Sequence, residues 1–420
     1  MRKDQKVIFN ILLTINLVIL AIKLISFNVS YAAFPKWCLI SEFLINYQGG
    51  FVRRGLVGEL LYRMCEPLGM NPTYIIVPVC IVAFSLFIYV LIKYFKKEHL
   101  CLWILPTYYV LGGADYIRKD FIIMLFVFWI FQQVPKFLAG SNNVAYMILM
   151  FGLLLNIHEA SFFIVYPTLC VYILFAKYNR ATLWARTAMI VTPLMIMLAL
   201  CVFTGSEECC NNIFESWDYA YPDAFKSLGG DENSITALTW ETWPTIRWHL
   251  LLNFATGAIF KYSPIILRPL AISIILWLMV QISFYHHRNS EDYSSRTGKF
   301  VFHAILQLIA LTPMFTILSC DFRRVCFYWT TSSFLAYFCL NGLPLNSSFI
   351  EKIQSPIKRL GEIVSKAVSP VYPFALLLLL GVPYADNDLV DYMSPIGQEV
   401  LPRVFWHATH INTDIYRLMQ

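Results

Sequence analysis

Residues 74–95 read YIIVPVCIVAFSLFIYVLIKYF, an apolar run whose only charged residue is Lys93. A helix of about 20 such residues crosses the hydrocarbon core of a bilayer. Ten further apolar runs lie along the chain, and none alternates as the strands of a membrane barrel do. The sequence therefore predicts eleven spanning helices, at residues 7–27, 74–95, 100–114, 121–138, 143–157, 160–176, 187–204, 264–285, 300–318, 325–341 and 369–383.

The composition agrees with a membrane protein. Apolar residues make up 58% of the chain and charged residues 14%, whereas a soluble domain has about 25% charged residues. Because a bilayer core accepts only helices or closed barrels, we expect an all-α fold, a polytopic transmembrane helix bundle forming one domain over residues 1–383. Residues 7–27 lack the cleavage site of a signal peptide, so we expect them to remain as the first helix.

The basic residues predict the orientation. With the N-terminus in the cytoplasm, lysine supplies 11 of the 17 basic residues on the inner side but only 4 of the 14 on the outer side. Lysine is a good topological anchor, whereas the planar fork of arginine grips phosphate or carboxylate. We therefore expect an arginine-rich periplasmic face with loops at 28–73 and 205–263 and a tail at 384–420. The net charge of +6 reflects inner-side anchoring, and no segment resembles a nucleic-acid-binding module.

Four charged clusters fall at the ends of the apolar runs, all on the expected periplasmic side. Charge beside hydrocarbon is costly and tends to mark a site. The first cluster is GGFVRRGLVGE at residues 49–59, in which Arg53 and Arg54 stand at the start of a short amphipathic helix predicted from Arg54 to Met64. A helix N-terminus already carries partial positive charge, so two arginines there favour a bound anion. The alternative partner is a lipid headgroup.

The second cluster, DYIRKD at residues 115–120, separates two apolar runs with almost no loop. In one interpretation Asp115 and Arg118 pair with each other across a tight turn. In the other, Asp115 or Asp120 is a base and Arg118 binds phosphate.

The third cluster is His158-Glu159, between the runs at 143–157 and 160–176. Histidine is the natural general base near neutral pH. Phe162 stands where a zinc protease needs its second histidine, so we expect no metal there. A packing or capping pair is the alternative.

The fourth cluster joins Asp321 to Arg323 and Arg324. Paired arginines so near hydrocarbon need an anion, and Asp321 neutralises only one of them. Over the four clusters six cations face four carboxylates, which leaves two positive charges for a ligand such as a diphosphate. Alternatively, these charges join neighbouring helices to one another.

The loop at 205–263 is acidic and aromatic, with Trp240, Trp243 and Trp248 near its end. Aromatic faces stack on sugar rings and carboxylates bind hydroxyls, so this composition suits a glycan. An interfacial aromatic belt explains it equally well. In a periplasmic loop a disulfide is an alternative to free thiols, from Cys209 or Cys210 to an exposed cysteine such as Cys38 or Cys65.

The chain resembles the O-antigen and capsule repeat-unit polymerases of bacterial inner membranes, and more distantly the lipid-sugar-dependent (GT-C) glycosyltransferases. The resemblance rests on the eleven-span organisation and on Gly-Phe-Val-Arg-Arg-Gly, Arg-Lys-Asp, His-Glu and Asp-x-Arg-Arg. It implies a glycan linked to undecaprenyl diphosphate as substrate, handled on the periplasmic face, and a chain-length regulator protein as partner. Glu42 and Glu59 are the carboxylates nearest the arginine motif that match the catalytic acid of the GT-C enzymes.

We therefore expect an inner-membrane glycosyltransferase that polymerises or extends lipid-linked oligosaccharide without a cofactor. The activated sugar carries its own diphosphate leaving group, and His158, Glu159 or Asp115 would deprotonate the acceptor hydroxyl. The residues expected to hold the diphosphate are Arg53, Arg54, Arg118, Arg323 and Arg324. The alternative is a transporter, either a flippase for lipid-linked glycan or an anion exporter, which would use the same arginines and need no base. An acyltransferase is a third alternative.

Overall fold

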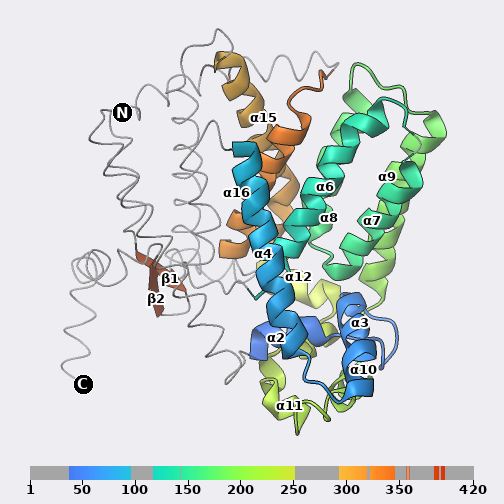
Figure 1. Cartoon of the computed structure of the whole chain (residues 1–420), viewed down its shortest axis with the longest axis vertical. Coiled ribbons are helices and arrows are strands. Elements are labelled where there is room, and N and C mark those ends of the chain that lie inside the picture. Colours follow the sequence, from blue (N-terminus) through green and yellow to red (C-terminus); the bar gives the residue numbers. More distant parts are fainter. Residues whose placement is uncertain are drawn as a thin grey trace.

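The structure, a computed structural model, describes residues 37–95, 117–141, 143–250, 293–318 and 322–345, positions 356 and 359, and residues 383–386 and 389–392. This part of the chain is mostly helical (Figure 1). Its helices are α2 (Trp37–Leu44), α3 (Gly55–Cys65), η1 (Glu66–Leu68), α4 (Thr73–Phe95), α6 (Asp120–Leu138), α7 (Val144–Ile157), α8 (Ser161–Phe175), α9 (Leu183–Val202), α10 (Glu207–Ser216), α11 (Ala224–Ser227), η3 (Gly230–Glu232), η4 (Thr236–Thr239), α12 (Thr242–Leu250), α15 (Tyr293–Pro313), η6 (Met314–Leu318) and α16 (Phe322–Leu340).

One element departs from the all-α expectation. Strands β1 (Pro383–Asp386) and β2 (Leu389–Tyr392) pair antiparallel, with Pro383 opposite Tyr392. This hairpin lies where we expected the C-terminal tail to begin.

Helices occupy seven of the expected spans. Four stretches are long and apolar enough to cross a membrane, namely Thr73–Val90, Asp120–Leu138, Leu183–Val202 and Lys299–Leu318, and α7 and α8 are shorter apolar helices. Within the described residues these helices fit a membrane protein. The expected spans at 7–27, 100–114 and 264–285, and all but the last residue of 369–383, lie outside the described residues. The number of spans and their orientation stay predictions.

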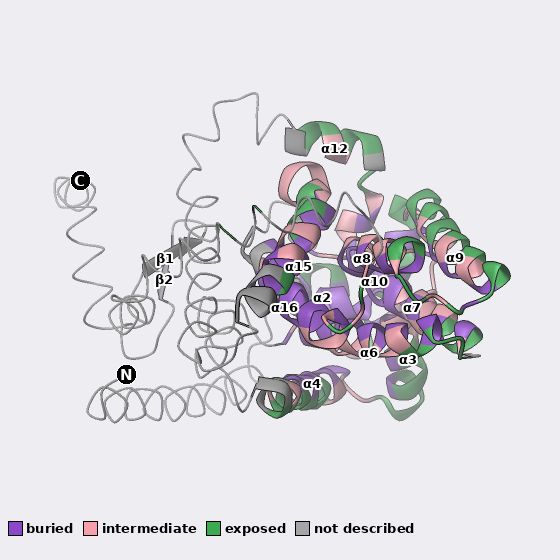
Figure 2. Cartoon of the chain, turned by 90° about the horizontal axis from the view of Figure 1, so that it is seen from above, coloured by how far each residue is buried: buried purple, intermediate pink, exposed green. Residues whose placement is uncertain are grey.

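Helix α6 is the centre of the bundle. It packs against α4, α7, α8 and α16, and its side chains Ile123, Met124, Val127 and Phe131 are fully buried. Peripheral helices such as α9 instead carry many exposed residues (Figure 2). On α9, Val191, Leu194 and Leu198 repeat at helical spacing and are all exposed. In water such a stripe would be costly, whereas in a bilayer it faces hydrocarbon.

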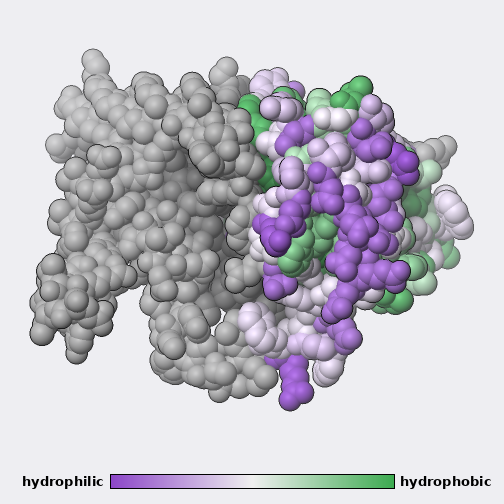
Figure 3. Space-filling model, turned by 90° about the horizontal axis from the view of Figure 1, so that it is seen from below, coloured by the Kyte–Doolittle hydropathy of each residue, from purple (hydrophilic) through white to green (hydrophobic). Residues whose placement is uncertain are grey.

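The short helices α2, α3, α10, α11 and α12 gather at one end of the bundle (Figure 1). That end carries mostly hydrophilic side chains over its described elements (Figure 3). The buried indole of Trp217 donates to the Leu44 carbonyl at 2.8 Å, and Asn46 Nδ2 donates to Ser216 Oγ at 2.8 Å. The segments expected as two outer loops therefore pack together as one cap over the bundle.

The glycines of the arginine motif serve this packing. A Cβ on Gly49 would lie 2.3 Å from the Cys209 carbonyl oxygen, and one on Gly58 would lie 2.0 Å from that of Ile45. At these two positions the absence of a side chain therefore lets protein backbone, rather than a ligand, approach closely.

Candidate functional site

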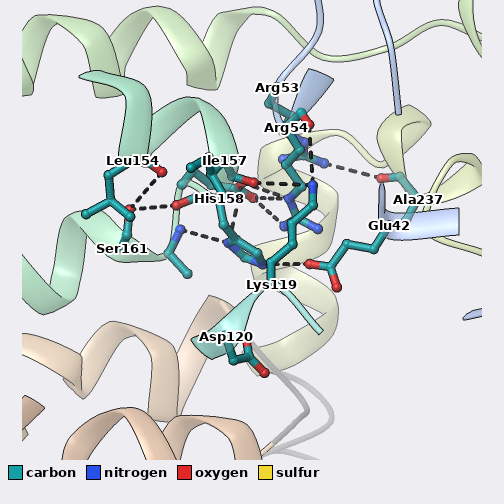
Figure 4. Close-up of polar contacts among 12 residues, drawn as sticks. Glu42, Arg53, Arg54, Lys119, Asp120, Leu154, Ile157, His158, Ser161 and Ala237 are labelled. Carbon is teal, nitrogen blue, oxygen red and sulfur yellow. Dashed lines mark hydrogen bonds and ion pairs between the residues drawn. The ribbon is translucent and has the colours of Figure 1, made fainter. Parts of the chain in front are cut away.

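Three of the four charged clusters meet where the bundle joins the cap. Arg53 and Arg54 precede α3, Lys119 and Asp120 begin α6, and His158 and Glu159 form the turn between α7 and α8 (Figure 4). Arg324 of the fourth cluster lies in the first turn of α16 and reaches Asp120. The expected convergence therefore holds for these residues, which lie close together because α6, α8 and α16 all begin, and α7 ends, at this end of the bundle.

Glu42 of α2, which the resemblance to GT-C enzymes offered as a catalytic acid, was not among the four charged clusters but lies at this site. Its side chain is buried, and its Oε1 accepts from Nη2 of Arg324 at 3.1 Å. Burial alone would raise the pKa of the Glu42 carboxyl, but Arg324, His158, Lys119 and Arg54 together lower it well below its ordinary value. Glu42 is the only charged residue in the apolar stretch WCLISEFLI at residues 37–45. An isolated charge in such a stretch tends to mark a functional site, and this pattern could have placed Glu42 among the charged clusters.

Arg54 and Glu159 form a bidentate ion pair. Arg54 Nε donates to Oε2 of Glu159 at 2.7 Å and to Oε1 at 3.0 Å, and Nη2 contacts Oε1 as well. Burial would raise the pKa of Glu159, but the charge and the hydrogen bonds of Arg54 hold it well below its ordinary value. Arg54 has a φ of 65°, a left-handed conformation that costs a non-glycine residue about 1 kcal/mol. The backbone is thus strained at the residue that makes this pair.

Arg324 forms ion pairs with two carboxylates. Its Nε donates to Oδ1 of Asp120 at 2.7 Å, while its Nη2 reaches Glu42. The Tyr328 hydroxyl, one turn further along α16, also binds the Asp120 carboxylate. Here the alternative interpretation holds, because these charges join α2, α6 and α16 to one another.

His158 is held in one tautomer. Its Nδ1 accepts the backbone N–H of Ala160 at 3.2 Å, so the proton of the neutral ring is on Nε2. That Nε2 lies 3.4 Å from Oε1 of Glu42 without completing a hydrogen bond. Burial, then the charge of Arg54, lower the pKa of His158 well below its ordinary value. In this arrangement His158 has no free lone pair, which weakens its expected role as the base.

Two cations at the site have no ion-pair partner within the described part of the chain. Arg53 Nη2 donates only to the Ala237 carbonyl, at 3.2 Å, and its Nε is buried without a hydrogen-bond partner. Lys119 is fully buried, and its Nζ makes only long contacts, 3.4 Å to the Ile157 carbonyl and 3.5 Å to that of Arg54. Burial lowers the pKa of Lys119 to about 8, so it is mostly charged at neutral pH.

The charges at this described site nearly balance. The cations Arg53, Arg54, Lys119 and Arg324 face the carboxylates Glu42, Asp120 and Glu159, so with a neutral His158 one positive charge remains. The expected surplus of two was counted over a different set of residues, which included Arg118, Arg323, Asp115 and Asp321 but not Glu42. Asp115 and Asp321 lie outside the described residues, and for Arg323 only the backbone, within α16, is described. Arg118 lies in the turn before α6, beside Lys119.

A pocket of about 270 Å³ opens beside these charges. Arg53, Arg54, His158 and Glu159 form its polar wall, and Leu200 of α9 is among the apolar residues of the opposite side. Ligand pockets commonly combine apolar walls with a few convergent polar groups. We call this the cationic pocket. It is placed to hold an anionic group at the end of helices that are apolar enough to cross a membrane.

The described part of the chain holds neither a metal centre nor a disulfide to Cys65. No group of three or more His, Cys, Asp or Glu side chains there is placed to hold a metal ion. Cys65, Cys209 and Cys210 are buried free thiols, so the alternative of a disulfide from the loop cysteines to Cys65 does not hold. The side chain of Cys38 is outside the described residues.

Comparison with protein-family models, with curated proteins and with solved structures found no match for this chain. The site therefore has to be interpreted from its own chemistry.

Proposed function

We propose that this protein is an inner-membrane glycosyltransferase that polymerises or extends oligosaccharide repeat units linked to undecaprenyl diphosphate, in the biosynthesis of a bacterial surface polysaccharide such as O-antigen or capsule. The observation that carries the proposal is the cationic pocket. It combines two arginines with the Glu159 carboxylate at the end of apolar helices. A lipid-linked diphosphate enters such a site from the bilayer, with its charged group at the periplasmic surface.

Arg53 is the first residue to engage the diphosphate. Its buried Nε lacks a hydrogen-bond partner within the described residues, and an orphaned buried donor costs roughly 1–3 kcal/mol until a ligand satisfies it. Arg54 and Lys119 add positive potential around the same point. Cations aimed at a leaving diphosphate stabilise the charge that develops as its bond to the sugar breaks.

In the reaction, the acceptor hydroxyl oxygen forms a bond to the anomeric carbon of the activated sugar. The bond from that carbon to the diphosphate oxygen breaks, and undecaprenyl diphosphate leaves with the electron pair. The hydroxyl proton passes to a base. Glu159 takes that role, because it lines the cationic pocket as an ionised carboxylate, and carboxylates act as bases in glycosidic chemistry.

His158 acts as a positioning residue in this scheme. Its ring lies between the Ala160 backbone and the Glu42 carboxylate, and the turn that carries it also carries Glu159. Arg54 fixes the Glu159 carboxylate from the other side. The base therefore keeps its orientation while the diphosphate binds to Arg53.

A transporter is the second candidate, and one observation favours it. Inside the bundle, His303 accepts from or donates to the Tyr172 hydroxyl at 2.8 Å, and Gln307 Nε2 donates to Thr168 Oγ1 at 2.7 Å. Ser332 Oγ donates to Oε1 of the same glutamine at 2.9 Å. Polar groups buried at membrane depth often mark a transport path. They also join helices, and none of them lines the cationic pocket, so we prefer the enzyme.

Glycan banding on a gel tests the proposal. Cells lacking the gene should accumulate a single lipid-linked repeat in place of a ladder, and wild-type protein should restore the ladder. Arg53→Lys and Arg53→Gln should fail at matched expression, because a point charge does not replace the guanidinium fork. Arg63→Gln is the matched control, since Arg63 is exposed on α3 and pairs only with Glu59 within the described residues.

Other outcomes separate the candidates. A full ladder in cells lacking the gene would refute the polymerase. Loss of both the ladder and the periplasmic single repeat, with the repeat retained on the cytoplasmic side, would favour the flippase.

A further inference from the structure

A second pocket, of about 300 Å³, adjoins the cationic pocket. Trp240, Glu241, Pro244, Thr245 and Trp248 line it. Trp240 and Thr245 line the cationic pocket too, so the two pockets share a wall. Helix α12, which carries most of these residues, packs against η6 at the end of a candidate span. When Arg53 and Arg54 hold the charged group of a ligand, the part of the ligand next to that group can therefore extend into the second pocket beside α12.

The aromatic residues of this second pocket lie on α12 and just before it. Pro244 and Trp248 are four residues apart on α12, which places them on the same side of the helix, and Trp240 lies in extended backbone two residues before the helix begins. Trp240 is 53% exposed and Trp248 51% exposed, whereas Trp217 in the same cap is fully buried with its N–H bonded to the Leu44 carbonyl. Both indoles are therefore about half exposed beside the charged site.

Glu241 decides which ligand suits this surface. Its carboxylate is exposed and forms no ion pair within the described part of the chain, while the Thr245 hydroxyl donates to the Glu241 backbone carbonyl. A carboxylate beside indole rings repels anionic lipid headgroups and is costly beside hydrocarbon. It accepts hydrogen bonds from hydroxyls, and the apolar faces of sugar rings pack on indole. A sugar ring carries both hydroxyls and an apolar face, so it suits the Glu241 carboxylate and the indole rings together.

We propose that the groove on α12, formed by Trp240, Glu241, Pro244, Thr245 and Trp248, is a sugar-binding subsite. The inference rests on the proposed function, because the cationic pocket holds the diphosphate and the groove holds the first sugars of the glycan attached to it. Trp240 stands at the junction, where the sugar nearest the diphosphate would lie. In this proposal Trp240 and Trp248 bind substrate and are not part of an interfacial aromatic belt.

Binding of two lipid probes to purified full-length protein tests the subsite. One probe is undecaprenyl diphosphate without sugar, and the other is the single-repeat lipid extracted from cells lacking this gene. The detergent must carry no sugar headgroup, so that it does not occupy the groove. Trp240→Ala, Trp248→Ala and Glu241→Gln are measured beside Trp243→Ala. Trp243 is the matched control because it is exposed on the same helix and lines neither pocket.

We expect Trp240→Ala and Trp248→Ala to weaken the sugar-bearing probe by about tenfold, the loss of one aromatic stacking contact. Because Trp240 also lines the cationic pocket, the sugar-free probe is compared on Trp248→Ala, which should bind it as the wild type does. Trp243→Ala should change neither affinity. Equal weakening of both probes, or the same effect in Trp243→Ala, would overturn the subsite.

The oligosaccharide released from the lipid separates the two proposals. If the wild type binds neither lipid probe but binds the free oligosaccharide through Trp240 and Trp248, the proposed function fails and the subsite stands. If it binds both lipid probes with equal affinity and the free oligosaccharide not at all, the subsite fails while the diphosphate site stands.

Discussion

Nε2 of His158 lies 3.4 Å from Oε1 of Glu42, and Nδ1 of the same ring accepts the Ala160 N–H. One ring nitrogen is thereby fixed as acceptor, and the other carries its proton toward a carboxylate. Glu42 in turn binds Arg324. A single connected set of side chains thus runs from α16 through α2 to the turn that carries Glu159.

The first prediction concerns stability at low pH. Burial and Arg54 lower the pKa of His158 well below its ordinary value of 6.5. Below pH 6.5 His158 therefore takes up a proton in the unfolded chain but not in the folded chain. The free energy of unfolding keeps the full contribution of His158 above that pH, and this contribution falls as the pH drops toward the lowered pKa. Within that window the loss is up to about 1.4 kcal/mol per pH unit.

Thermal unfolding in detergent from pH 7.5 to 5 measures this effect. His158→Gln keeps a polar side chain of similar size and removes the titration, so its Tm should change less over this range than that of the wild type. Parallel curves for the two proteins would contradict a buried neutral histidine. The pKa values of Glu42 and Glu159 are also lowered, so their contribution is lost only below their ordinary value of 4.5.

The second prediction separates binding from folding at the adjacent arginines. Arg54→Gln strands the partly buried Glu159 carboxylate, so it should lower the free energy of unfolding by up to about 3 kcal/mol. Arg53→Gln breaks only a hydrogen bond to the Ala237 carbonyl, so its Tm should stay near that of the wild type. Both variants should lose polymerisation. In the double variant Arg54→Gln/Glu159→Gln, stability should recover in part and activity should not. Recovery of activity would mean that the pair is purely structural.

The third prediction concerns Lys119, a fully buried cation that lines neither pocket. Within the described residues it forms no ion pair, so Lys119→Met should leave the free energy of unfolding unchanged or raise it by about 1 kcal/mol. The net charge of the described site would fall to zero, and binding of undecaprenyl diphosphate should weaken by about threefold to tenfold, as expected for loss of one nearby charge at intermediate dielectric. Denaturant titration and lipid binding measure the two effects. A large loss of stability would show that Lys119 holds the fold.

The fourth prediction tests how the cap positions the arginines. Gly58→Ala places a Cβ 2.0 Å from the Ile45 carbonyl oxygen, and backbone on both sides must shift. We expect it to lower the Tm and to reduce polymerisation, because α3 carries Arg54 at its start. Gly152→Ala is the matched control on α7, where the nearest atom is the end of the Ile196 side chain at 3.4 Å. It should be neutral or stabilise the helix by up to about 1 kcal/mol. Equal effects of the two substitutions would contradict the close packing of α3.

The sequence predicts the parts of this molecule that depend on local pattern. Apolar runs such as 121–138 become helices, and the polar ends of those helices come together because neighbouring antiparallel helices place their charged turns at the same end of the bundle. The glycine motif was recognised, but its partners were not. Which backbone lies opposite Gly49 or Gly58 is a long-range contact that no local pattern encodes.

Electrostatic detail is equally non-local. The pairing of Arg54 with Glu159 and of Arg324 with Asp120 joins residues more than a hundred positions apart. Glu42 reaches Arg324 over a similar range, so the count of surplus charge from sequence did not include it. The tautomer of His158 depends on the backbone amide of Ala160 in a tight turn. Sequence composition could name histidine as a base but could not show that its Nδ1 lone pair is already engaged.

The most direct test of the central claim is polymerisation by purified protein in phospholipid vesicles. The substrate is the single-repeat lipid from cells lacking this gene, and the products are separated by glycan length. The account predicts that wild-type protein forms a ladder and releases undecaprenyl diphosphate, and that Arg63→Gln does the same. Arg53→Gln, folded with an unchanged Tm, should leave the single repeat unconverted. A ladder of wild-type length and rate from Arg53→Gln, or no conversion by folded wild-type protein that binds the lipid, would contradict the account.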